Sequence, residues 1–194
     1  MRKREGNKEK AILDAAISIF AQNGYENAKI STIAQKAGVA TGSVYLYYKN
    51  KEGILLTIFD QLWLPLTHKL MVTVKRTDID PSQKLDIVIE DFLGFFVEHP
   101  AIAAVFIKEQ HKLMEEQRGN AAKYYNDFFD IAEEIIKEGA DKKNFNSEIN
   151  IKLARYFILG GLRNILLQWA QHPDLFTLEQ IKQNAKYLIK QGLK

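Results

Sequence analysis

The chain has 194 residues, of which 46% are apolar, and this is enough for one or two domains with a buried core. It contains no cysteine, which excludes disulfide frameworks and thiolate metal sites. The net charge of +3 is unevenly spread, because residues 1–52 contain nine Lys or Arg and five Asp or Glu, whereas residues 53–194 contain 18 and 19. Positive charge near the N-terminus favours an interaction with phosphate groups.

No apolar run is long enough to span a bilayer, and the basic start of the chain is not followed by the apolar stretch of a signal peptide. We therefore expect a soluble, cytoplasmic protein that does not contact membranes. Residues 1–6 are polar and basic, and we expect them to be loosely ordered. Two interpretations of this segment stay open: a solvated tail, or an arm that reaches nearby phosphates.

In the first third of the chain, apolar residues recur at helical spacing from about residue 7 to the Asn23-Gly24 pair, which should end the helix. A second helix is expected at about 31–36. Asn50 is a suitable N-cap for a longer helix, in which Pro65 should produce a bend or an interruption.

The rest of the chain shows the same helical periodicity between loops rich in Pro, Gly and polar residues. Helices are expected at about 82–98, 101–117, 121–138, 147–171 and 177–191, with Ser147 opening the fourth of these and Thr177 capping the last. No segment alternates with period two over several residues, so no sheet is expected. The predicted fold class is all-α, with about nine helices divided between residues 1–50 and residues 51–194.

The stretch from Gly38 to Leu55, GVATGSVYLYYKNKEGIL, has the spacing of a helix-turn-helix. Gly38 falls at the turn, where the backbone must become left-handed, and Ala34 is small where the two helices cross. The second helix exposes small, hydroxylated and aromatic residues, which suit contacts in the major groove of DNA.

The run from Ala37 to Glu52, AGVATGSVYLYYKNKE, resembles the signature of the TetR family of bacterial transcriptional repressors, and the similarity extends back to about Glu9. Lys29 and Ala40 stand where the family often has Ser or Thr, so helix capping there is expected to be weaker. The resemblance implies a homodimeric repressor with a helix-turn-helix DNA-binding domain at residues 1–50. It also implies that residues 51–194 form a domain for dimerisation and for binding a small hydrophobic effector.

The expected contacts to double-stranded operator DNA are the exposed residues of the two short helices and the first turn of the next one. They are Ser31, Thr41, Gly42, Ser43, Tyr45, Tyr47 and Lys51. Tyr48 is expected to pack inside the domain. The second helix has no Arg or Gln for bidentate base recognition, so we expect few direct base contacts and a contribution from groove shape.

The C-terminal body is rich in aromatic residues, which are typical either of an ordinary helical core or of the lining of a ligand cavity. The resemblance favours a cavity. The expected lining residues are Trp63, Phe92, Phe96, Phe106, Gln110, Met114, Tyr125, Phe129 and Trp169.

The segments from Lys51 to Asp60 and from Leu153 to Trp169 are similar to TetR relatives that control fatty-acid degradation and respond to long-chain acyl-CoA. We therefore expect an effector of that class. The alternative is a multidrug-sensing regulator of an efflux gene. Sensors of lipophilic cations usually need buried carboxylates, and few carboxylates fall on the apolar faces of the predicted helices.

Gly160 and Gly161 lie inside a predicted helix, where each costs about 1 kcal/mol relative to Ala, so a close neighbour should offset them. Packing inside the chain and a subunit interface are both open. The interface residues would be Tyr156, Leu159, Leu167 and Gln168, with Ile181, Ala185, Leu188 and Ile189 of the last helix. A dimer is expected in any case, because paired recognition helices must reach half-sites about 34–36 Å apart.

Nothing in the sequence indicates catalysis or a metal site. The four histidines lack metal-ligand spacing, and no nucleophile elbow, phosphate-binding loop or dinucleotide turn is present. We therefore expect no enzyme activity, no cofactor and no metal. Two other classes stay open: an enzyme with a hidden site in the body, and an architectural DNA-binding protein without an effector.

Overall fold

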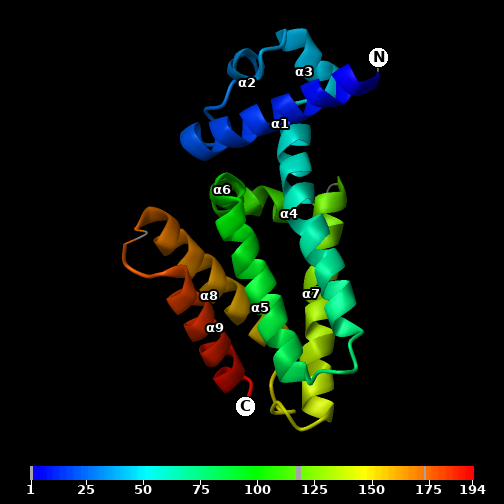
Figure 1. The fold of residues 1–194 in the computed structure, drawn as a ribbon, viewed down its shortest axis with the longest axis vertical. Helices are drawn as coiled ribbons and strands as arrows, with labels where there is room; N and C mark the ends of the chain where they lie inside the picture. The colour runs from blue at the N-terminus through cyan, green and yellow to red at the C-terminus, as the bar shows by residue number, and fades with distance from the viewer. Residues whose placement is uncertain (1, 117–118, 173) are drawn as a thin grey trace. The chain divides into compact units, whose positions relative to one another are not determined.

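The computed structural model describes residues 2–116, 119–172 and 174–194, and all regular structure in these residues is helical (Figure 1). The described helices are α1 (Arg2–Asn23), α2 (Ile30–Ala37), α3 (Thr41–Tyr47), α4 (Lys51–Val74), α5 (Pro81–Glu98), α6 (Pro100–Glu116), α7 (Gly119–Asp141), α8 (Ile151–Gln171) and α9 (Leu178–Gly192). The absence of strands from this part of the chain confirms the all-α prediction.

Two helices begin at other residues than expected. Helix α1 begins at Arg2, because Lys, Arg and Glu in its first turns favour helix even before the apolar periodicity starts. Helix α8 begins at Ile151 and not at Ser147, because the Asn150 side chain accepts a hydrogen bond from the Leu153 backbone N–H at 3.0 Å and thus caps the helix.

Helix α4 continues through Pro65 to Val74, so of the two predicted outcomes the interruption does not occur, and a bend at Pro65 stays a prediction. Pro65 itself is exposed, whereas Leu62, Trp63 and Leu66 beside it are buried. A proline inside a helix costs about 3 kcal/mol, but burial of each large apolar side chain contributes about 1.5–3 kcal/mol. The buried face of α4 therefore outweighs the loss at Pro65.

Several predicted helix ends are confirmed. Gly24 and Gly38 have φ angles of 77° and 68°, in the left-handed region that favours glycine. Asn50 accepts a hydrogen bond from the Gly53 backbone N–H at 2.8 Å, and Thr177 forms a reciprocal capping box with Gln180.

The chain forms two compact units, residues 1–62 with 99–122 and residues 63–98 with 123–194. In the first unit α1 packs on α2, α3 and α6 around buried apolar residues such as Ile12, Phe20 and Ile33. The proposed division by function, at residue 50, stays a prediction.

An aromatic cluster centred on Trp63 forms the core of the second unit. The Trp63 ring lies 4.9 Å from Tyr125 in edge-to-face geometry, 5.5 Å from Phe128, 5.8 Å from Phe129 and 6.4 Å from Phe92, measured between ring centroids. Aromatic pairs of this kind contribute about 0.5–1.5 kcal/mol beyond their buried area. The cluster therefore joins α4, α5 and α7.

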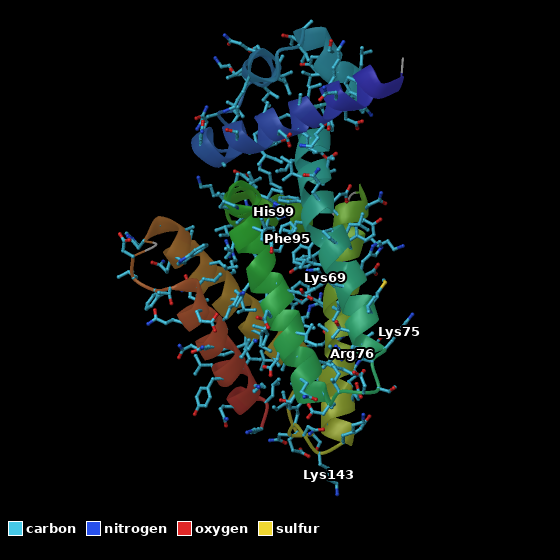
Figure 2. All side chains as sticks on the ribbon, viewed as in Figure 1. Lys69, Lys75, Arg76, Phe95, His99 and Lys143 are labelled. Atoms are coloured by element: carbon cyan, nitrogen blue, oxygen red, sulfur yellow. The ribbon has the colours of Figure 1, made fainter. Side chains whose placement is uncertain are left out.

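Ion pairs connect α5 to its two neighbours. Lys69 of α4, labelled in Figure 2, pairs with Asp91 of α5 at 2.9 Å, and Lys190 of α9 pairs with Asp86 of α5 at 2.8 Å. Exposed pairs of this type contribute about 0–1 kcal/mol each, so they orient the helices more than they stabilise them.

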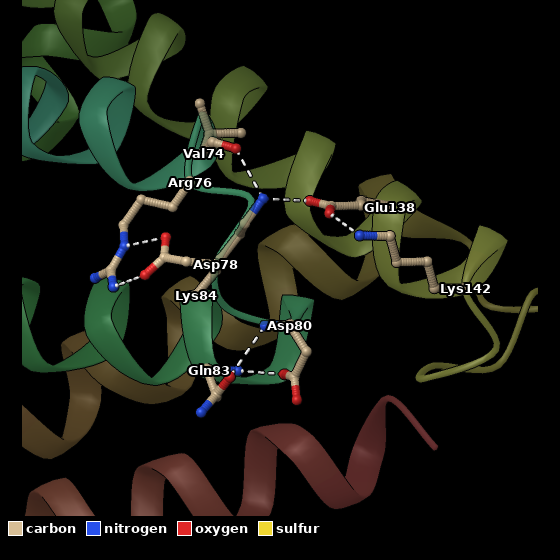
Figure 3. A network of polar contacts seen from close by, with 8 residues as sticks. All are labelled: Val74, Arg76, Asp78, Asp80, Gln83, Lys84, Glu138 and Lys142. Atoms are coloured by element: carbon tan, nitrogen blue, oxygen red, sulfur yellow. Dashed lines mark hydrogen bonds and ion pairs between the residues drawn. The ribbon is translucent and has the colours of Figure 1, made fainter.

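A buried lysine joins the end of α4, the start of α5 and the end of α7 (Figure 3). Lys84 is 2% exposed, and its ammonium donates to the Val74 carbonyl at 2.8 Å and to Glu138 Oε2 at 2.7 Å. Lys142 donates to the other Glu138 oxygen at 2.7 Å. The Lys142 and Lys84 ammonium groups hold the pKa of Glu138 below its usual value.

We expect the substitution Lys84→Met to lower the free energy of unfolding by about 2–3 kcal/mol, because it leaves a carbonyl and a carboxylate without their buried donor. Denaturant unfolding followed by circular dichroism measures this. Since the folded-state pKa of Glu138 is depressed below its usual value of 4.5, the difference from wild type should be full above that value and shrink as the pH falls below it through the depressed pKa. Lys137→Met, at an exposed site of α7, is the matched control. Equal stability of both variants would contradict the assignment.

Candidate nucleic-acid interface and effector site

The helix-turn-helix geometry predicted around Gly38 is confirmed. Helices α2 and α3 are joined through Gly38 in the left-handed conformation, and Ala34 and Val44 are buried between them. Neither Lys29 nor Ala40, the residues before these two helices, makes a side-chain capping bond, as the sequence indicated. The N-termini of both short helices are therefore not stabilised by side-chain caps.

The expected DNA contacts lie mostly on the outer side of these helices. Ser31, Thr41, Gly42 and Tyr45 are exposed, while Ser43 and Tyr47 are half-buried. Tyr48 is buried, as predicted. Its hydroxyl donates to the Glu9 carbonyl at 3.4 Å, and burial raises its pKa to about 12. Contact with DNA stays a prediction for each of the expected residues.

Sequence reasoning left out two exposed lysines beside the same face. Lys29 directly precedes α2, and Lys49 follows the C-terminus of α3. Phosphate contacts by Lys position a protein on duplex DNA without reading its sequence. Their places at the ends of the two short helices are the signal that could have found them.

Lys51, which was expected to meet a phosphate, holds the loop between α1 and α2. Its ammonium donates to the carbonyls of Tyr25, Glu26 and Ala28 at 2.7, 3.1 and 3.3 Å, and it lies 4.3 Å from the centroid of the Tyr25 ring. A phosphate contact by Lys51 stays a prediction. Any such phosphate would share the ammonium with three carbonyls.

Helix α6 holds the same loop from another side. The Tyr25 backbone N–H donates to the buried carboxylate of Glu109 at 3.2 Å, and the Lys112 ammonium lies 4.8 Å from the Tyr25 ring. Lys112 also forms an ion pair with Glu26, which lowers the pKa of Glu26. The Tyr25 ring therefore contacts two cations, from α4 and from α6.

The substitution Lys51→Met separates the two roles of this side chain. We expect the free energy of unfolding to fall by about 2 kcal/mol, because three carbonyls lose a charged donor. If Lys51 also contacts a phosphate, the slope of log K against log salt for duplex DNA should flatten by about one unit. Denaturant unfolding and fluorescence anisotropy measure the two effects.

The matched control is Lys49→Met, which should leave the stability within about 0.5 kcal/mol of wild type. Unchanged stability of Lys51→Met would contradict the structural role, and an unchanged salt slope would contradict the phosphate role.

A small apolar cavity of about 60 Å³ lies within the second unit, between α5, α7 and α8. Phe92 and Phe129, both predicted to line a ligand cavity, contribute to its wall together with Leu159. Two charged residues that sequence reasoning missed, Glu133 and Arg155, also line it. They come from different helices, so no local pattern in the sequence indicated the pair.

Arg155 is the main polar group of this cavity wall. It donates from Nη1 to Asp130 at 2.9 Å and to Glu133 at 3.1 Å, and its guanidinium lies 4.9 Å from the Phe129 ring. Its Nε is buried and has no hydrogen-bond partner in the described part of the chain. A buried donor without a partner costs about 1–3 kcal/mol, so this group favours an added acceptor.

The other predicted cavity residues are not brought into this wall. Trp63, Phe96 and Tyr125 are buried in the aromatic core of the second unit, and desolvation raises the pKa of Tyr125 to about 12. Phe106 and Gln110 are buried in the first unit.

Trp169 lies in neither of these buried groups and is half-buried on α8. Met114 belongs to α6, but its side chain lies outside the described residues. A ligand role for any predicted cavity residue stays a prediction.

Asp60 of α4 is a partly buried carboxylate that sequence reasoning also missed. Its Oδ1 has no hydrogen-bond partner in the residues described, and desolvation raises its pKa. A raised pKa favours the neutral acid, which makes Asp60 a weak counter-charge for a cation.

Helices α8 and α9 leave an open apolar groove of about 520 Å³ on the second unit. Its rim includes Leu153, Phe157 and Leu188, which are large apolar residues with more than half of their surface exposed. From the predicted interface set, Tyr156 and Gln168 are also exposed. The remaining members, Leu159, Leu167, Ile181, Ala185 and Ile189, are buried or half-buried within the chain.

Packing within the described chain does not account for the glycine pair of α8. No atom lies within 4 Å of a Cβ placed at Gly160 or Gly161, and both residues are exposed. Neither glycine has the positive φ that would require it. The open space at both glycines leaves this face of α8 accessible to close approach by another molecule.

Among the residues described, no group of three or more His, Asp or Glu side chains is arranged to hold a metal ion. A search of the same residues finds no helix that is both long and apolar enough to cross a membrane.

Comparison with known families agrees with this geometry. Residues 12–58 match the family described as bacterial regulatory proteins, tetR family, and residues 78–185 match the tetracyclin repressor-like C-terminal domain. The second match covers more than half of the chain, so this protein belongs to the TetR family of bacterial transcription regulators.

Two of the matches come from Bacillus subtilis and extend over nearly the whole chain. The fatty acid metabolism regulator protein of Bacillus subtilis is 27% identical over 191 residues, which cover 98% of each chain. The crystal structure of the regulator FadR from Bacillus subtilis in complex with stearoyl-CoA is 26% identical, with a TM-score of 0.78 over 95% of this chain and 99% of that one.

The structure of SmeT, the repressor of a multidrug efflux pump in Stenotrophomonas maltophilia, is 20% identical, with a TM-score of 0.75 over 95% of this chain and 89% of that one. At this identity the likeness concerns the fold alone.

Proposed function

We propose that this protein is a homodimeric repressor that binds a palindromic operator through α2 and α3 and is released by a long-chain acyl-CoA. The observation that carries the proposal is similarity over nearly the whole chain to a regulator bound to stearoyl-CoA. The DNA contacts are the exposed hydroxyl groups and Tyr45 on the helix-turn-helix, with phosphate contacts from the lysines beside it.

The dimer forms through α8 and α9. Leu153, Phe157 and Gly161 follow one another at four-residue intervals on one face of α8, so they form a stripe that includes one of the two unexplained glycines. A symmetric partner would cover this stripe with the same stripe of its own chain. A dimer would also supply the two copies of α3 that paired operator half-sites require.

The substitution Gly161→Leu tests this interface. Within one chain the added side chain begins in open space and removes a helix-destabilising glycine, so we expect a folded protein of at least wild-type helicity. Across the proposed interface it prevents the close approach, so we expect a monomer with operator affinity reduced at least tenfold. Analytical ultracentrifugation and circular dichroism measure the two results. A folded Gly161→Leu dimer would contradict the interface.

The effector site lies in the second unit, at the cavity between α5, α7 and α8. Its 60 Å³ is too small for an acyl chain, so ligand binding requires the helices to separate. The wall is apolar apart from Arg155 and Glu133, which suits a hydrocarbon chain. The unpartnered Arg155 Nε offers a donor for a carbonyl oxygen.

The ligand acts on DNA binding by shifting an equilibrium between two conformations. Helix α4 begins beside the helix-turn-helix and continues into the second unit, so a shift along it reaches Lys51. Since Lys51 holds the loop between α1 and α2, a small displacement would change the orientation of α1 against α2. A nearly complete shift requires about a 10⁴-fold preference of the ligand for one state.

Titration of a labelled operator complex with stearoyl-CoA tests the proposal, and free CoA serves as the matched control without the apolar chain. We expect stearoyl-CoA to raise the operator Kd more than tenfold and CoA alone to leave it unchanged. The variant Ala132→Phe places a large side chain in the cavity and should remove the response to stearoyl-CoA, while operator binding persists. Operator binding that no acyl-CoA or lipophilic cation changes would indicate an architectural protein instead.

Multidrug sensing is the second candidate, because SmeT shares the fold and Asp60 is a partly buried carboxylate. The raised Asp60 pKa weakens this alternative. Release of the operator by lipophilic cations, and not by acyl-CoA, would favour it.

A further inference from the structure

Helix α3 exposes an apolar side chain that the expected DNA contacts do not include. Leu46 is 83% exposed, which equals Phe157 as the highest value among the large apolar residues described. Phe157 lies on the α8 surface assigned to the partner subunit. Leu46 instead lies in the recognition helix of the helix-turn-helix.

A single exposed leucine is ordinary on a protein surface, so the neighbours of Leu46 decide the argument. Gly42 precedes it by four residues and therefore lies on the same face of α3. No atom lies within 4 Å of a Cβ placed at Gly42, and its φ is not positive. Neither packing within the described residues nor backbone geometry requires this glycine, and the open space beside it would allow close approach of another molecule.

Charged and aromatic residues on the two short helices and at their ends indicate what that molecule is. Tyr45, adjacent to Leu46, is 55% exposed, and the exposed lysines Lys29 and Lys49 lie at the ends of α2 and α3. Residues 1–52 carry a net charge of +4. A basic surface that allows close approach suits duplex DNA.

Leucine can read only one feature of a base edge. It has no hydrogen-bonding group, so it cannot satisfy the donors and acceptors that guanine, cytosine and adenine present in the major groove. The thymine C5-methyl is the apolar group there, and contact with it removes both apolar groups from water.

We propose that Leu46 is a specificity-determining residue that reads thymine. In each half-site its side chain contacts the C5-methyl of one thymine, and the missing side chain at Gly42 allows α3 to approach the base edges closely. This inference rests on the proposed DNA-binding function and adds a preferred base at one position of each half-site.

Removal of single methyl groups from the operator tests the inference. In an operator selected with the purified protein, each thymine is replaced in turn by deoxyuridine, which lacks the C5-methyl but keeps the hydrogen-bonding groups. We expect one thymine per half-site at which this change raises the Kd about fourfold, and about fifteenfold when both half-sites are changed. Fluorescence anisotropy at fixed salt measures the Kd.

The variant Leu46→Ala completes a double-mutant cycle with the deoxyuridine operator. It should bind the thymine operator about as weakly as wild type binds the deoxyuridine operator, and it should not distinguish the two. Since the side chain is 83% exposed, truncation should leave folding intact. Val72→Ala, at a site on α4 that is 68% exposed, is the matched control and should keep the wild-type sensitivity to deoxyuridine.

Two results would overturn the inference while the proposed function stands. One is that no thymine methyl group affects the Kd of wild type more than that of Leu46→Ala. The other is that Leu46→Ala loses as much affinity for random duplexes as for the operator. Failure of the wild-type protein to select any duplex would instead overturn the proposed function itself.

Discussion

The N-terminal unit depends on the hydrogen bonds that the Lys51 ammonium donates. This ammonium joins the first turn of α4 to the three carbonyls of the loop after α1, and Tyr25 in that loop also contacts Lys112 and Glu109 of α6. Two helices that are distant from this loop in sequence, α4 and α6, therefore converge on one short segment. Displacement of either helix would leave charged and backbone hydrogen bonds of this segment unpaired. The loop before the helix-turn-helix is thus held by both other helices of the first unit.

The second unit combines two kinds of packing with different consequences. Around Trp63 the aromatic rings form a closed core that resists change, since displaced rings would lose both burial and edge-to-face contacts. Beside Arg155 the packing is incomplete, with a small cavity and an unpaired donor. Conformational change should therefore concentrate where α8 meets α5 and α7. The closed core and the cavity adjoin within the second unit, because Phe92, Phe128 and Phe129 belong to both.

The local features of the fold could be predicted from the sequence, because they depend on nearby residues: the turn at Gly38, the cap at Asn50 and the capping box at Thr177. The sequence could not decide between a bend and an interruption at Pro65, where burial of the neighbouring residues accompanies a continuous helix. The partners of Lys51 lie 23 to 26 residues away, so no periodicity could indicate them. Residue type alone indicated the expected cavity residues, whereas the spacing of the helices decides which of them meet. Of that set, only Phe92 and Phe129 line the cavity wall.

The placement of the chain's two tryptophans has a practical consequence for spectroscopy. Trp63 is fully buried among aromatic rings, whereas Trp169 is half-buried on α8. Their indole groups therefore experience different polarity, and the intrinsic emission of the protein should combine a short-wavelength and a longer-wavelength component. Quenchers dissolved in water should reduce the emission of Trp169 and leave that of Trp63 unchanged. Changes at α8 and in the aromatic core can therefore be followed separately without any attached dye.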